Sequence, residues 1–440
     1  MTNLELGIWS FPVLLVLIFL RIPIGLAMLL CGLAGTWLVM GSTAPILAKL
    51  KGETYSTFSN YSLSIIPLFL LMGQFASLGG MSQSLFRAAN AWLGHRRGGV
   101  AMSAIGACAG FGAICGSSLA TAATMAQVAL PELKRYGYSG ALATGTLAAG
   151  GTLGILIPPS VVLVIYAILA EQNIAKLFVA AFVPGILAAI GYMIAISIYV
   201  RLYPGSAGSS PRAPYSERFR ALLDVWPVLL VFLAVVGGIY TGWFTPTEAA
   251  AIGAAGTGLI ALLNGGLTRK TFLESILMTA SATAMIFFIV YGAAMYNSFL
   301  ALSQLPANAA AFITGQGFDP WLVLVGILIF YLILGCFMDS LSMILLTIPI
   351  FFPIVTALDF GLGPEEFAIW FGILVLIVVE VGLITPPVGM NLFIINSMAR
   401  DTPIIQTYRG VTPFVLSDIV RTVLLTIFPV ISLFMVRWLY

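Results

Sequence analysis

Long apolar runs separated by short polar loops dominate this chain. About 20 apolar residues suffice for a helix to cross the hydrocarbon core of a bilayer. Single spans are predicted at Leu6 to Leu20, Ile22 to Met40, Leu63 to Leu78, Lys176 to Val200, Leu222 to Tyr240, Thr247 to Asn264, Phe272 to Leu300 and Val411 to Val436. The pattern predicts an all-α polytopic membrane protein.

Two longer runs carry the same interruption and are predicted to be discontinuous helices. The run Tyr138 to Ala170 contains GILIPPS starting at Gly154, and the run Phe367 to Ala399 contains GLITPPV starting at Gly382, 228 residues later. A Pro-Pro pair withdraws two backbone donors and forces the preceding residue out of helical geometry. Each copy should therefore interrupt a membrane helix and leave carbonyl groups without partners.

Two further apolar stretches, Gly98 to Leu130 and Trp321 to Phe351, are too long for one span and are interrupted halfway by small polar residues. The interruptions are Gly116 to Ser118 in the first stretch and Asp339 with Ser340 in the second. Irregular backbone at membrane depth survives only inside protein or beside a cavity. Both stretches are therefore predicted to be re-entrant helical hairpins.

Loop charge orients these elements. The first hairpin is bracketed by Arg96 and Arg97 on one side and by Lys134 and Arg135 on the other, which predicts that it opens to the cytoplasm. No Lys or Arg occurs from Thr271 to Ala399, so the second hairpin is expected to open to the opposite side. The two halves then form an inverted repeat with ten spans, two hairpins and both termini outside.

The predicted organisation has two repeats joined by a basic linker. The first repeat is 1–201, with scaffold spans in 1–80 and a hairpin and broken helix in 98–170; the linker is 202–221; the second repeat is 222–440, with scaffold spans in 222–300, a hairpin and broken helix in 321–399 and a closing span in 411–437. The linker contains Pro, Gly and Ser and belongs in the cytoplasm. Residues Thr43 to Ser59 could form an additional surface helix.

Composition agrees with the apolar pattern. The 440 residues are 60% hydrophobic and 8% charged, with a mean hydropathy of +1.07, whereas a soluble domain carries about a quarter charged residues. The net charge of +3 comes from residues scattered in loops, which argues against nucleic acid as a partner. The first apolar stretch lacks a basic n-region and a cleavage site, so we expect a retained span.

Residue types needed for most enzyme chemistry are scarce. The cysteines Cys31, Cys108, Cys115 and Cys336 lie in apolar segments and are interpreted as small hydrophobes. His95 is the only histidine, and no H-E-x-x-H, G-x-S-x-G or Walker pattern occurs. No catalytic or cofactor-binding residue is predicted.

Inverted repeats place hairpin tips and helix breaks close together near the bilayer midplane, where secondary transporters hold ions and substrates. A sodium ion there would exchange water for carbonyl oxygens freed by Gly and Pro and for Ser or Thr hydroxyls. The candidate ligands are Gly116, Ser117, Ser118, Gly154, Ile157 and Pro159 from the first half, and Gly335, Asp339, Ser340, Gly382, Thr385 and Val388 from the second. The alternative is that the Pro-Pro pairs only kink helices and the glycines permit close packing.

Three side chains in the second half sharpen this hypothesis. Asp339 is the only carboxylate at a hairpin tip, and an ionisable group at that depth indicates function; the alternative is a structural partner for backbone donors at the tip. Glu380 precedes the second break by two residues and could face an aqueous gate or have a paired structural role. Thr385 occupies the repeat position of Ile157 and adds a hydroxyl.

Ordered motifs carry a resemblance to a known family. They are GSSLATAATMAQVALPELKRYGYSG, LGILIPPSVVLVIYA, FVPGIL, GWFTPTEAAAIGA and GLITPPVGMNLFII. Together they resemble the large membrane (M) subunit of the tripartite ATP-independent periplasmic (TRAP) transporters, and the similarity runs from about Arg21 to the C-terminus. The family's sodium sites use hairpin tips and G-x-x-x-P-P breaks, which match Gly116 to Ser118, Gly154 to Pro159 and Gly382 to Val388.

The resemblance implies a sodium-coupled elevator importer in a bacterial or archaeal inner membrane. It also implies two partners, a small four-helix membrane subunit expected as a separate polypeptide and a periplasmic substrate-binding protein that delivers an organic acid, a carboxylate or related anion. Three alternatives are a stand-alone sodium/dicarboxylate elevator symporter, a membrane-embedded enzyme and a passive channel. The enzyme would need clustered His, Asp or Cys, which the chain lacks.

Overall fold

The structure is a computed structural model that describes residues 1–440, and all of its regular elements are helices. The first half contains α1 (Asn3–Phe19), α2 (Ile24–Met40), α3 (Ala44–Phe58), the 3₁₀ turn η1 (Tyr61–Ser64), α4 (Ile65–Leu78), α5 (Met81–Leu93), α6 (Gly99–Cys115), α7 (Ser118–Arg135), α8 (Gly140–Leu156), α9 (Val161–Leu169) and α10 (Ile174–Leu202).

The second half repeats this order with local differences. It contains α11 (Tyr215–Leu223), α12 (Trp226–Phe232), the π-helical turn η2 (Leu233–Gly237), α13 (Gly238–Tyr240), α14 (Pro246–Leu263), α15 (Arg269–Ser303), α16 (Leu305–Gly315), α17 (Pro320–Gly335), α18 (Ser340–Thr356), α19 (Pro364–Gly382), α20 (Met390–Met398), α21 (Ile404–Ile427) and α22 (Val430–Leu439). The predicted all-α polytopic fold is confirmed.

Both predicted hairpins are present. The first consists of α6 and α7, which are separated by Gly116 and Ser117; Gly116 has a φ of +64°, a left-handed conformation that glycine adopts without steric cost. The second consists of α17 and α18, separated by the turn from Cys336 to Asp339. In each hairpin the second helix begins with a serine, Ser118 or Ser340.

Both predicted discontinuous helices are also present. Helices α8 and α9 are bent by 45° across a short break that contains Pro158 and Pro159. Helices α19 and α20 are separated by a longer segment, Leu383 to Gly389, that contains the second Pro-Pro pair. Each break is where the prolines remove the amide donors that a continuous helix requires.

Ion pairs place the bases of the two hairpins on opposite faces of the molecule. Lys134, at the end of α7, pairs with Asp401, which follows α20 (Nζ–Oδ1 2.6 Å). Lys176, near the start of α10, pairs with Glu365, at the start of α19 (Nζ–Oε1 2.6 Å). The pairs α8–α9 and α19–α20 therefore cross the molecule in opposite directions, so the two hairpins open to opposite sides as predicted.

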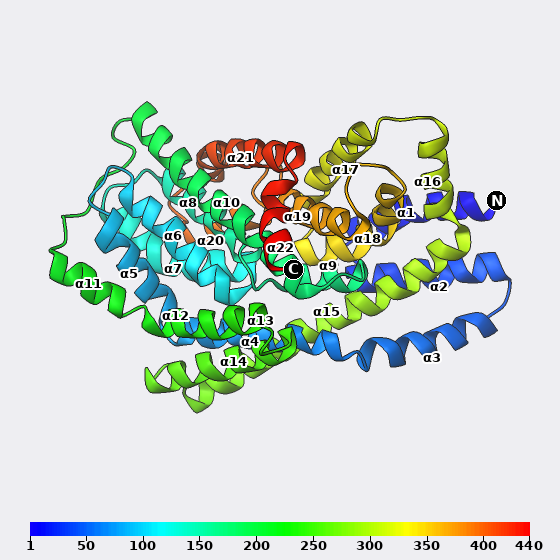
Figure 1. Cartoon of the computed structure of the whole chain (residues 1–440), viewed down its shortest axis with the longest axis horizontal. Helices are drawn as coiled ribbons and strands as arrows, with labels where there is room; N and C mark the ends of the chain where they lie inside the picture. Colours follow the sequence, from blue (N-terminus) through cyan, green and yellow to red (C-terminus); the bar gives the residue numbers. More distant parts are fainter.

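The helices that precede the hairpins pack across the two halves. In Figure 1, α2 lies along α15 and α4 lies along α14, which agrees with the packing of these pairs. Gly25 and Gly32 allow the close approach of α2 to α15: a Cβ atom on Gly32 would lie 2.7 Å from the backbone of Met295. Small residues permit this backbone proximity between membrane helices.

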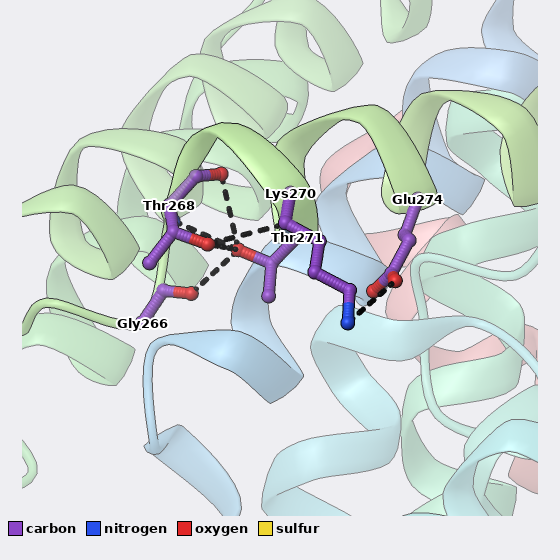
Figure 2. Close-up of polar contacts among 5 residues, drawn as sticks. All are labelled: Gly266, Thr268, Lys270, Thr271 and Glu274. Atoms are coloured by element: carbon purple, nitrogen blue, oxygen red, sulfur yellow. Dashed lines mark hydrogen bonds and ion pairs between the residues drawn. The ribbon is translucent and has the colours of Figure 1, made fainter.

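Capping side chains fix where the long helices of this region begin. Figure 2 shows Thr268, whose hydroxyl accepts a hydrogen bond from the amide of Thr271 at the start of α15 (3.2 Å), with Lys270 and Glu274 one turn apart on the same helix. Thr245 and Glu248 form the same kind of capping box at the start of α14. Such boxes satisfy amide groups that the first turn leaves without partners.

The closing segment differs from the sequence-based prediction. The apolar pattern predicts one span from Val411 to Val436, but α21 ends at Ile427 and α22 begins at Val430. Pro429 lies at the junction and lacks the amide donor that a continuous helix would need there. Helix α11 overlaps the end of the predicted linker 202–221, whose role as a linker stays a prediction.

Three short helices lie outside the predicted spans. Helix α3 matches the surface helix considered for Thr43 to Ser59, whereas α5 and α16 were not predicted. Six helices are long and apolar enough on their own to cross a membrane, or seven if α8 and α9 form one span. Several further apolar helices, including α1 and α2, have 17 residues or fewer, so the number of ten spans and the assignment of domains stay predictions.

Candidate functional site

The first hairpin and the first helix break are in direct backbone contact. A Cβ atom on Gly112, in α6, would lie 2.6 Å from the Cα atom of Gly154 in α8. A Cβ atom on Gly154 would in turn meet the hydroxyl of Thr121 and the carbonyl oxygen of Ser117, at 2.4 and 2.7 Å. Glycine is therefore required where the tip of the hairpin reaches the end of α8.

The second half contains an equivalent glycine crossing. A Cβ atom on Gly335, at the end of α17, would lie 2.9 Å from the Cα atom of Gly382, and one on Gly382 would lie 2.5 Å from that of Gly335. The break is also tied to the hairpin by the amide of Gly389, which donates to the carbonyl oxygen of Cys336 (3.2 Å). Each hairpin is thus held against the broken helix of its own half.

Both hairpin tips meet one carboxylate. The hydroxyl of Ser118, from the first hairpin, donates to Oε2 of Glu380, and the hydroxyl of Ser340, from the second, donates to Oε1 at 2.7 Å. Glu380 lies in α19 and is 1% exposed. The structure therefore shows the paired role considered for Glu380. The alternative, that Glu380 faces an aqueous gate, is wrong for this conformation.

The other tip residues have local partners. Ser117 is the N-cap of α7 and accepts a hydrogen bond from the amide of Ala120 (3.5 Å). Asp339 is the N-cap of α18 and accepts hydrogen bonds from the amide and the hydroxyl of Ser342 (3.1 and 2.5 Å). Gly116 lies against the first break, because a Cβ atom there would be 3.2 Å from the carbonyl oxygen of Pro159.

Several carbonyl groups at the two breaks accept no backbone hydrogen bond. They belong to Ile157 and Pro159 in the first break and to Thr385 and Val388 in the second. Ile157 and Pro159 are buried, and a buried carbonyl without a partner is energetically unfavourable. The hydroxyl of Thr385, which follows α19, already donates to the carbonyl oxygen of Val381 near the end of that helix (2.6 Å).

The polar atoms near the hairpin tips and the helix breaks are oxygen atoms. No three His, Cys, Asp or Glu side chains gather closely enough to hold a transition metal. The available donors are carbonyl and hydroxyl oxygens with the carboxylates of Asp339 and Glu380 nearby, and hard cations bind oxygen ligands of this kind. Helices α7 and α18 begin at Ser118 and Ser340, so the positive end of a helix dipole lies at each tip.

A second polar cluster inside the helices was missed by the sequence analysis. Tyr192, in α10, donates to Oδ2 of Asp418 in α21 (2.7 Å) and lies 3.0 Å from the hydroxyl of Thr152, two residues before Gly154. Arg421 pairs with Asp418 at 2.8 Å, and both side chains are buried. The sequence feature that could have revealed this cluster is an acidic and a basic residue three positions apart inside the predicted closing span.

The inverted hairpins, whose tips meet at Glu380, and the two broken helices define a class of protein, the polytopic secondary transporters. The model of one family, described as "Tripartite ATP-independent periplasmic transporter, DctM component", matches residues 11–431. The chain belongs to this TRAP transporter family and is a large permease component. Like the other permeases of this family, it is a multi-pass transport protein of the inner membrane and not an enzyme.

Curated relatives cover nearly the whole chain. A C4-dicarboxylate TRAP transporter large permease protein, DctM, from Pseudomonas aeruginosa is 37% identical over 93% of this chain and 94% of its own length. The sialic acid TRAP transporter large permease protein SiaM from Vibrio cholerae is 30% identical over 95% of both chains. The ectoine TRAP transporter large permease protein TeaC from Halomonas elongata is 29% identical over 95% of this chain and 96% of its own length.

The architecture also resembles that of a solved transporter. The crystal structure of the Alcanivorax borkumensis YdaH transporter, whose topology is described as unusual, superposes with a TM-score of 0.66. The superposition covers 89% of each chain at 15% identity, and at this identity the likeness concerns the fold alone. The same arrangement of helices is therefore not confined to close relatives of this chain.

Proposed function

We propose that this chain is the membrane permease of a sodium-coupled importer of an organic acid. The observation that carries the proposal is the set of unpaired carbonyl groups at both helix breaks, beside two hairpin tips that meet at Glu380. Carbonyl and hydroxyl oxygens can replace the hydration shell of sodium, and these ligands carry no net charge that would have to be buried. Binding free energy from such ions can then be coupled to uptake.

Two sodium sites are proposed, one in each half. The first would use Gly116, Ser117, Ser118, Gly154, Ile157 and Pro159, and the second would use Gly335, Asp339, Ser340, Gly382, Thr385 and Val388. Support comes from the contact of each hairpin with its own broken helix, at Gly112 with Gly154 and at Gly335 with Gly382. Sodium here is a transported ion, and it would enter and leave with each cycle.

The proposed movement is of the elevator type. Helix α8 packs against α6, α7, α20 and α21, whereas α2 packs with α15 and α4 packs with α14. The first group would form the moving domain that carries the hairpins, and the second group would form the scaffold. Support comes from this packing, because each group has its own internal helix contacts and α15 touches α18 at the boundary.

The proposed substrate is a carboxylate or a related anion. Relatives are named for C4-dicarboxylate, sialic acid and ectoine, and the first two are organic acids. The family description, tripartite and periplasmic, favours a binding-protein-dependent system over a stand-alone symporter. We therefore propose a periplasmic substrate-binding protein and a small four-helix membrane subunit as partners.

Reconstitution tests this proposal directly. The chain would be purified with its small subunit, incorporated into vesicles and supplied with its binding protein and a panel of radiolabelled organic acids. We expect uptake of at least one acid above its external concentration, and only when an inward sodium gradient and the binding protein are both present. Uptake that proceeds without sodium, or that never exceeds equilibration, would contradict the proposal.

A further inference from the structure

The two hairpins are joined by a single side chain. Ser118 is the first residue of α7 and Ser340 is the first residue of α18, and each donates its hydroxyl proton to a different oxygen of Glu380. The two serines come from opposite halves of the inverted repeat. No other side-chain hydrogen bond joins the two hairpin tips, so the carboxylate is their shared polar contact.

This carboxylate is buried and lies next to the glycine crossing of its own half. Glu380 is 1% exposed, and Gly382, two residues later in α19, touches the backbone of Gly335 in α17. No Lys, Arg or His forms an ion pair with Glu380. The two serine hydroxyls are therefore its only hydrogen-bond partners, and hydrogen bonds in such a low-dielectric place are strong.

We propose that Glu380 is a positioning residue that couples the two cation sites by holding both hairpin tips against one carboxylate. The inference rests on the proposed sodium-coupled function. When a cation draws one tip into its binding geometry, the carboxylate moves with the serine of that tip. The serine of the other tip follows, because both oxygens belong to one rigid group. Occupation of one site then prepares the other, which is positive cooperativity in sodium.

The test is the dependence of uptake on sodium concentration in reconstituted vesicles that contain the complete complex. For the unmodified chain we expect a sigmoidal curve. Glu380→Leu removes both hydrogen bonds at similar side-chain volume, and we expect its curve to become hyperbolic, with the half-saturating sodium concentration raised about tenfold, within the usual range of coupling between sites. Glu380→Gln can still bond to both serines and should retain part of the cooperativity.

A double-mutant cycle separates coupling from general damage. Ser118→Ala and Ser340→Ala are made singly and together, first in the unmodified chain and then in the Glu380→Leu chain. Because both serines act through one carboxylate, we expect their effects on the half-saturating sodium concentration to be non-additive in the first background and additive in the second. If Glu380 had a merely structural role, the interaction between the two serine substitutions would be the same in both backgrounds.

The control is Glu365→Leu, which removes an exposed acid from the same helix and should leave the sodium curve unchanged. If the unmodified complex ignores sodium, the proposed function itself fails. If it depends on sodium but shows no cooperativity, or if Glu380→Leu preserves the sigmoidal curve, the coupling is overturned. Should Glu380→Leu not fold, the serine cycle in the unmodified chain decides, and additive effects there overturn the coupling.

Discussion

Asp339 has two distinguishable tasks at the tip of the second hairpin. Its side chain caps α18 through Ser342, and it also brings a negative charge to the proposed second site. Asp339→Asn keeps the cap, because Asn is as good an N-cap as Asp, but it removes the charge. We expect Asp339→Asn to fold normally and to lose sodium-stimulated uptake. Folding is measured as the melting temperature in detergent, and uptake is measured in vesicles with and without sodium.

Asp339→Ala provides the comparison. It removes both the cap and the charge, and we expect it to destabilise the protein by about 1 kcal/mol in addition to weakening uptake. Full sodium activation in Asp339→Asn would show that the side chain serves the helix alone. The second site would then have to be built without it.

The buried pair of Asp418 and Arg421 makes a prediction about stability. Arg421→Leu would leave the carboxylate of Asp418 in the helix bundle without its cation, and breaking a buried pair in this way costs about 3–5 kcal/mol. We expect a marked fall in the melting temperature of the purified complex. The double variant Asp418→Leu with Arg421→Leu should recover most of the loss, and a double variant as unstable as the single one would refute the pairing argument.

Single residues also show where sequence reasoning ends. The tips at Ser118 and Ser340 could be predicted, because small polar residues interrupt apolar runs there. The partnership of both serines with Glu380 could not, because the direction of a helical side chain depends on how distant helices pack. The pair of Asp418 and Arg421 was visible as charge inside an apolar run, and it was overlooked because that run was interpreted as an ordinary closing span.

At the scale of helices, the glycine crossings make the hairpins sensitive to one added methyl group. Gly335→Ala would place a Cβ atom 2.9 Å from the Cα atom of Gly382. Overpacking of this kind costs about 1–3 kcal/mol, and we expect lower stability together with loss of uptake. The matched control is Gly326→Ala in the same helix, where a Cβ atom would meet nothing within 4 Å. If the two substitutions reduced stability and uptake equally, the glycine crossing could not be the cause of the loss.

The elements themselves were predictable to the extent that backbone chemistry dictates them. Pro-Pro pairs cannot continue a helix, so both breaks were located from the sequence. Helices α5 and α16 were not predicted, because they are short and lie between apolar runs, where periodicity gives a weak signal. The split between α21 and α22 was missed although Pro429 marks it, because the apolar run continues on both sides.

For the whole molecule, the opposite directions of the two hairpins are testable by labelling. Single cysteines at Lys134 and Glu365 replace exposed residues on opposite faces. After the four native cysteines are removed, we expect a membrane-impermeant thiol reagent added outside intact cells to label Glu365→Cys and not Lys134→Cys. In inverted vesicles the pattern should reverse. Labelling of both positions from one side would contradict the inverted repeat.

Helix α15 has a further consequence for the complete protein. Its 35 residues make it about 52 Å long at 1.5 Å per residue, whereas the hydrocarbon core is about 30 Å thick. An oblique course reconciles these lengths, and α2, packed along it, must share that slant. Lipid thickness should then set the angle of both helices, so uptake in vesicles of short-, medium- and long-chain phosphatidylcholine should pass through an optimum; a flat response would show that the slant is indifferent to the surrounding lipid.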